Sequence, residues 1–104
     1  MNTTPLRKVT IIAERVLRDE ILDLLRDLGA TGWTIAAVEG QGSRGVRASE
    51  WEGRSVQIDT LVTENLAATI MQQVAETYFT HWGVIVYSSP VEVMRGGKYG
   101  AGEK

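Results

Sequence analysis

The residues best suited to chemistry lie in one glycine- and arginine-rich segment that begins at Gly40. It reads Gly-Gln-Gly-Ser-Arg-Gly-Val-Arg, and a polar run continues from it to Arg54. The glycines leave backbone N–H groups accessible, Ser43 adds a hydroxyl, and Arg44 and Arg47 place two guanidinium groups three residues apart. Such groups form an anion cradle, and phosphate is the anion that they fit best. The segment therefore predicts a nucleotide-responsive loop.

Two other interpretations of this segment were considered. The string Gly-x-Gly-x-x-Gly from Gly40 matches the dinucleotide fingerprint, but that fingerprint requires a helix directly after it. Residues 47–53 show no apolar helical stripe, so the match does not predict a dinucleotide site. The second interpretation is a solvated surface loop whose arginines pair with Glu50 and Glu52, and the sequence alone leaves it open.

The elements on either side of the loop follow from hydrophobic periodicity. An apolar stripe runs from Leu17 to Leu28, with Gly29 in the position of a left-handed helix end. A second stripe runs from Ala67 to Tyr78 and is capped by Thr63 or Asn65. These patterns predict one helix over 15–28 and a second that follows its cap and carries the stripe 67–78. They also predict strands over 8–13, 33–38, 55–63 and 84–87, and a short edge strand over 90–94.

The predicted order is βαββαβ, which is the ferredoxin-like arrangement of the α+β class. Both faces of strand 33–38 are fairly apolar, whereas helices would cover only one of them. We therefore expect a partner subunit to bury the open sheet face. The domain is expected to span residues 1–95, followed by a flexible glycine-rich tail over 96–104.

Composition limits the classes of function. The chain has 104 residues and a net charge of −2, which argues against a nucleic-acid-binding protein. It has no cysteine, which excludes disulfides and thiolate zinc sites. No apolar run approaches the ~20 residues of a membrane span, so we expect a cytoplasmic protein.

Aromatic residues and the single histidine complete the set of candidates. We expect His81 to shape the turn before the last strand instead of acting as a catalytic base. Trp33 is expected in the core or at a subunit interface, and Trp82 in a turn. Trp51 lies in the polar loop and is a candidate partner contact, because exposed aromatic residues anchor interfaces.

Two segments resemble the PII signalling proteins. Residues 32–42 (Gly-Trp-Thr-Ile-Ala-Ala-Val-Glu-Gly-Gln-Gly) are similar to the stretch that leads into the PII T-loop. Residues 42–49 (Gly-Ser-Arg-Gly-Val-Arg-Ala-Ser) resemble the corresponding motif of the SbtB group, PII-like regulators of the cyanobacterial bicarbonate transporter SbtA. The end of the last helix at Tyr78 and the strand 83–87 also resemble that group.

The resemblance implies a homotrimer that binds cAMP, AMP, ADP or ATP in clefts between subunits and that is not an enzyme. The T-loop, about residues 40–54, would regulate an SbtA-like transporter at the cytoplasmic face of the membrane, where the protein would be recruited peripherally. The implied nucleotide-binding residues are Thr34, Gln41, Gly42, Ser43, Arg44, Arg47, Gly83 and Val84, and the expected partner-binding residues are Ser49, Trp51 and Arg54.

The chain also departs from the PII pattern. Arg44 replaces the glutamine that typical PII proteins use around magnesium and 2-oxoglutarate, so 2-oxoglutarate sensing is not expected. No metal ligand is assigned, although Mg2+ or Ca2+ with ATP stays open. The cysteine-containing end of many SbtB proteins is absent, which excludes thiol redox control.

Two alternatives from other classes were weighed. An ACT-like sensor would bind small molecules such as amino acids between ferredoxin-like subunits, without needing the arginine loop. An acylphosphatase-like hydrolase would carry its phosphate loop between the first strand and the first helix, where this chain offers only Glu14 and Arg15.

Overall fold

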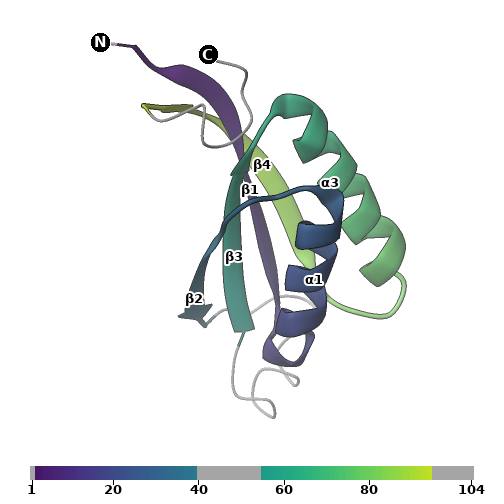
Figure 1. The fold of residues 1–104 in the computed structure, drawn as a ribbon. Coiled ribbons are helices and arrows are strands. Elements are labelled where there is room, and N and C mark those ends of the chain that lie inside the picture. The colour runs from purple at the N-terminus through teal and green to yellow at the C-terminus, as the bar shows by residue number, and fades with distance from the viewer. Residues whose placement is uncertain (1, 40–54, 95–104) are drawn as a thin grey trace.

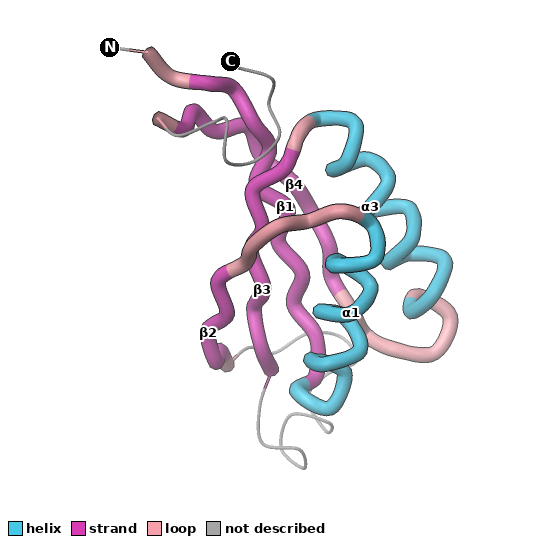
Figure 2. Tube along the Cα trace, viewed as in Figure 1, coloured by secondary structure: helices cyan, strands magenta, loops and turns pink. Residues whose placement is uncertain are grey.

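Four antiparallel strands form a sheet, and two helices cover one of its faces (Figure 1). The computed structural model describes residues 2–39 and 55–94. The elements are β1 (Thr4–Glu14), the 3-10 turn η1 (Arg15–Leu17), α1 (Arg18–Leu28), β2 (Thr34–Val38), β3 (Ser55–Val62), α3 (Glu64–Tyr78) and β4 (Ile85–Val93). The strand order is β2-β3-β1-β4, which confirms the predicted ferredoxin-like α+β fold. Figure 2 shows the connection that leads from α1 to β2 at one edge of the sheet.

Local sequence signals fix the ends of both helices. Gly29 ends α1 in the left-handed region with a φ of 114°, and its N–H donates to the carbonyl of Leu25. A residue with a Cβ is strained in that conformation, so glycine is favoured there. Thr63 caps α3 by accepting a hydrogen bond from the N–H of Leu66 at 3.3 Å, which selects Thr63 over Asn65 as the cap.

Two strands are longer than their periodicity predicted. β1 begins at Thr4 instead of residue 8, because its first residues pair with the end of β4. The expected strands over 84–87 and 90–94 form one strand that runs through Pro90. Proline lacks an N–H donor and is tolerated on an edge strand, and β4 is an edge strand.

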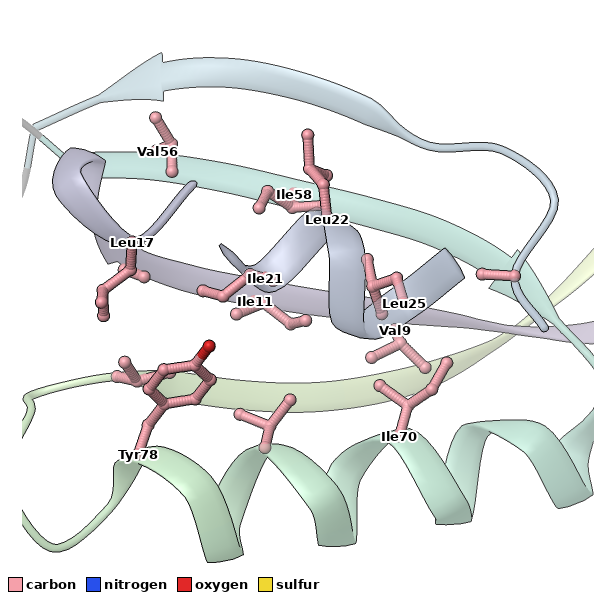
Figure 3. Close-up of a cluster of buried hydrophobic side chains, with 14 of the residues drawn as sticks. Val9, Ile11, Leu17, Ile21, Leu22, Leu25, Val56, Ile58, Ile70 and Tyr78 are labelled. Atoms are coloured by element: carbon pink, nitrogen blue, oxygen red, sulfur yellow. The ribbon is translucent and has the colours of Figure 1, made fainter. Parts of the chain in front are cut away.

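A hydrophobic core fills the space between the sheet and the helices (Figure 3). Ile11 of β1 and Ile58 of β3 pair directly and are fully buried beneath Ile21 and Ile70. In α1 the residue Leu22 is also buried, whereas the predicted stripe members Leu24 and Leu28 lie at the core margin. The buried face of α1 is centred on Ile21, Leu22 and Leu25, so Leu24 and Leu28 fall at its edge.

Tyr78 closes the core at the end of α3. Its side chain is buried, and its hydroxyl points from α3 toward α1 (Figure 3). Burial, the negative charge of Glu20 and a hydrogen bond to Glu20 raise the pKa of Tyr78 from 10.0 to about 12. The neutral phenol is therefore the form that the folded protein favours.

This shift predicts a loss of stability at high pH. Because the folded pKa lies above 10.0, the contribution is fully present below pH 10 and is lost as the pH rises to about 12. We expect the difference in free energy of unfolding between wild type and Tyr78→Phe to fall by on the order of 2 kcal/mol over this range. Urea unfolding at a series of pH values checks this. A difference that stays constant from pH 9 to pH 12 would contradict it.

Candidate ligand site at the two edges of the sheet

The sheet face opposite the helices carries Thr34, the first of the predicted ligand residues that the structure describes. Thr34 begins β2, is exposed and pairs with Asp59 of β3. Asp59 in turn pairs with Thr10 of β1, and Thr10 pairs with Tyr87 of β4. A row of polar side chains therefore crosses the middle of this open face.

Two of these residues form a hydrogen-bonded cluster that the sequence analysis missed. The hydroxyl of Thr10 donates to a carboxylate oxygen of Asp59 at 2.6 Å. The side-chain amide of Gln57 donates to the two Asp59 oxygens at 3.4 and 3.2 Å. The signal was a polar residue on each of two strands, Thr10 on β1 and Asp59 on β3, but the pairing of those strands was needed to connect them.

Next to this polar row lies a second row on the same face, which is apolar except for Gln57. It crosses the sheet from Ala36 through Gln57 and Ile12 to Ile85. Ile85 is 52% exposed and Tyr87 is 45% exposed, which is high for large hydrophobic residues in a strand. Neither helix covers this face, so these side chains are available to a partner surface.

Gly83 and Val84, the other described candidates, precede β4 at the opposite edge of the sheet. Gly83 is exposed, whereas Val84 is only 8% exposed and belongs to the core. A ligand at this edge would therefore meet the backbone of Val84 instead of its side chain.

The strand order separates the two edges. Thr34 on β2 and Gly83 before β4 lie on either side of β3 and β1. Neighbouring strands are about 4.8 Å apart, so three steps place the edges roughly 14 Å from each other. Thr34 and Gly83 of one copy therefore cannot line the same small pocket.

The long loop joins β2 to β3, so it leaves the sheet on the side of the first of these edges. Ile12 pairs with Ile85 at the start of β4, and Glu14, two residues further along β1, pairs with Ser55. Ser55 also pairs with Val38, the last residue of β2. Residues 39–54 are thus attached at the end of the sheet where the chain enters β4. The predicted residues Gln41, Gly42, Ser43, Arg44, Arg47, Ser49, Trp51 and Arg54, and the tail 96–104, lie outside the described residues.

The remaining candidates have structural roles. Trp33 and Trp82 are partly buried against the core, and the Arg26 guanidinium lies 5.3 Å from the ring centre of Trp33. The N–H of His81 donates to the carbonyl of Tyr78 in the turn after α3, where the sequence placed it. The described residues contain no group of acidic or histidine side chains that could hold a metal ion.

The first strand and first helix are joined only by the turn Arg15–Leu17. No phosphate-binding loop of the acylphosphatase kind fits there. Within the described ranges, no helix has the length and apolar character that crossing a membrane requires.

A family comparison decides between the remaining alternatives. The model of the nitrogen regulatory protein P-II family matches residues 6–98. The chain belongs to this family. It is also similar to a PII-like signalling protein from Thermus thermophilus, with 43% identity over 95% of this chain and 99% of that chain and a TM-score of 0.83.

Structures of CPII from Thiomonas intermedia are similar to this PII-like protein at 26% identity. One is bound to ADP, AMP and acetate, with a TM-score of 0.81 over 95% of this chain and 98% of CPII. Another is bound to ADP and bicarbonate, with a TM-score of 0.82 over 94% of this chain and 97% of CPII. The PII-like signalling class predicted from residues 32–49 is therefore confirmed.

The Thr10–Asp59 cluster makes a prediction about stability. Thr10→Val removes the hydroxyl that bonds the Asp59 carboxylate, and hydrogen bonds to charged groups contribute about 1.5–3 kcal/mol. We expect a loss of this size in the free energy of unfolding, measured in urea at one protein concentration. Thr69→Val on the exposed side of α3 is the control, with an expected change of at most about 0.5 kcal/mol. Equal stability of the two variants would contradict the role assigned to the cluster.

Proposed function

We propose that this PII-like protein binds adenine nucleotides between the copies of a homotrimer and reports the bound nucleotide through its T-loop, residues 40–54. The observation that carries this proposal is the placement of Thr34 and Gly83 at opposite edges of one sheet. The ADP and AMP bound to CPII support the choice of adenine nucleotides.

Assembly follows from the open sheet face. Ile85, Ile12 and the ring of Tyr87 offer apolar surface there, and the other members of the polar row offer hydrogen-bonding groups. Packing three copies around these faces removes the apolar side chains from water. The same packing brings the β2 edge of one copy to the β4 edge of the next.

In this arrangement the nucleotide is held by two kinds of group. The hydroxyl of Thr34 lines the adenine pocket, and the backbone at Gly83 and Val84 closes the cleft from the neighbouring copy. Arginine guanidinium groups form paired, charge-assisted hydrogen bonds with phosphate oxygens. The phosphate-binding residues are proposed to be Gln41, Gly42, Ser43, Arg44 and Arg47.

The T-loop connects the ligand to a partner. We propose that Ser49, Trp51 and Arg54 contact an SbtA-like bicarbonate transporter at the cytoplasmic face of the membrane. The protein is then recruited to the membrane through the transporter, in the ligand state that presents these side chains.

A small anion is a second candidate ligand. CPII has been solved with bicarbonate beside ADP, which favours bicarbonate as a co-ligand. Bicarbonate would link the nucleotide signal to the carbon supply that the transporter controls. A Mg2+ or Ca2+ ion with ATP would be held mainly by the triphosphate.

Nucleotide titrations test the proposal. We expect ADP, AMP, ATP and cAMP to raise the unfolding temperature, and a ligand at 100 times its Kd adds about 2.7 kcal/mol of stability.

Arg44→Ala and Arg47→Ala should each weaken binding of ADP about 10- to 100-fold, because each removes a charge-assisted contact. Calorimetric titration with and without bicarbonate, Mg2+ and Ca2+ measures these changes.

A matched arginine provides the control. Arg18→Ala removes an arginine that pairs with Asp19 on α1 and is not among the proposed ligand residues, so it should leave the Kd unchanged. Trp51→Ala should keep nucleotide binding but lose cosedimentation with vesicles that contain the transporter. The nucleotide proposal fails if no adenine nucleotide binds, or if the Arg44 and Arg47 variants bind like Arg18→Ala.

A further inference from the structure

Thr60 is a buried hydroxyl residue on the helix-covered face of β3. It is 1% exposed and lies between Ile58 and Val62, which point to the same face. A hydroxyl in such surroundings is costly unless it is hydrogen-bonded. The Thr60 hydroxyl donates to the backbone carbonyl of Gly32 at 2.6 Å.

This hydrogen bond anchors Gly32, two residues before the candidate ligand residue Thr34. The ladder between β2 and β3 begins with Thr34 opposite Asp59. Gly32 precedes Thr34 by two residues, so the Thr60 hydroxyl attaches β3 to the chain beyond the end of that ladder. Thr60 and Asp59 are neighbours in β3, and they fix the segment 32–34 from two successive positions.

The same segment is also held from α1. The Arg26 guanidinium lies over the ring of Trp33, and Asp23 holds that guanidinium through an ion pair of 3.0 Å. Trp33 packs against the core. The backbone on both sides of Trp33 is thus tied to β3, while its ring is tied to α1.

We propose that Thr60 is a positioning residue for the nucleotide site: its hydrogen bond to Gly32 sets the place of Thr34 at the β2 edge. This inference rests on the proposed nucleotide binding. Valine fills nearly the same volume as threonine, so packing alone does not require a hydroxyl at this position. A segment 32–34 that is already ordered before the ligand binds preserves affinity, because binding then costs less conformational entropy.

Replacing Thr60 tests this role. Thr60→Val should raise the Kd for ADP about five- to tenfold, the equivalent of one lost hydrogen bond. Amide hydrogen exchange over residues 31–36 should become faster, because the segment loses its attachment to β3. Thr60→Ser keeps the hydroxyl but loses a methyl group, so it should be less stable than wild type and yet bind ADP with the wild-type Kd.

Ile70→Val is the control for a purely structural effect. Ile70 is a fully buried residue of α3. Its replacement by valine lowers stability but leaves the hydrogen bond from Thr60 to Gly32 in place. Its Kd for ADP should equal that of wild type. The inference is overturned if wild type binds ADP and Thr60→Val binds equally well, or if Thr60→Ser or Ile70→Val loses as much affinity as Thr60→Val. Failure of wild type to bind ADP would instead overturn the proposed function and this inference together.

Discussion

The structure depends on the burial of one face of the sheet beneath two helices. Ile11 and Ile58, on the two central strands, pack under Ile21 of α1 and Ile70 of α3, and all four side chains are fully buried. Complete burial of one such side chain contributes about 1.5–3 kcal/mol. Because this core fixes β1 and β3 at the centre, β2 and β4 must be the edges, and the second face remains uncovered by the helices.

The proposed site between copies would link ligand binding to assembly. A nucleotide that contacts one edge from each of two copies stabilises the assembled form, since it binds that form in preference to separate chains. Val38 and Ser55, which flank the loop 40–54, lie at the end of the sheet where the chain enters β4. The segment 32–34 is held in place by the hydrogen bond from Thr60 to Gly32 and by the contact of Arg26 with the ring of Trp33.

Much of the fold could be predicted from local sequence, and the reasons are physical. Gly29 and Thr63 act on the residues next to them, so helix ends are visible in the sequence. The sequence predicted two strands, 84–87 and 90–94, where the structure has the single strand β4. A strand can run through Pro90 because β4 lies at an edge, and that position follows from the strand order and not from the local sequence.

The site was harder to predict, because its groups meet across the sheet. Thr60 bonds a carbonyl 28 residues away, and Thr10 bonds a carboxylate 49 residues away. Neither contact has a local sequence signature. The residue types suited to phosphate were recognisable at Arg44 and Arg47, whereas the proposed division of the site between two copies rests on the strand order, which the local sequence does not show.

Mixing two inactive variants tests the central claim, that the site is shared between copies, most directly. Thr34→Trp obstructs the β2 edge, and Gly83→Glu places a carboxylate at the β4 edge, where the backbone has no positive φ that would exclude a side chain. Each variant alone should bind no ADP. After subunit exchange at equal concentrations, about one quarter of the sites should combine two intact edges and bind ADP with the wild-type Kd. Binding by either variant alone, or no recovery in the mixture, would contradict a site shared between copies.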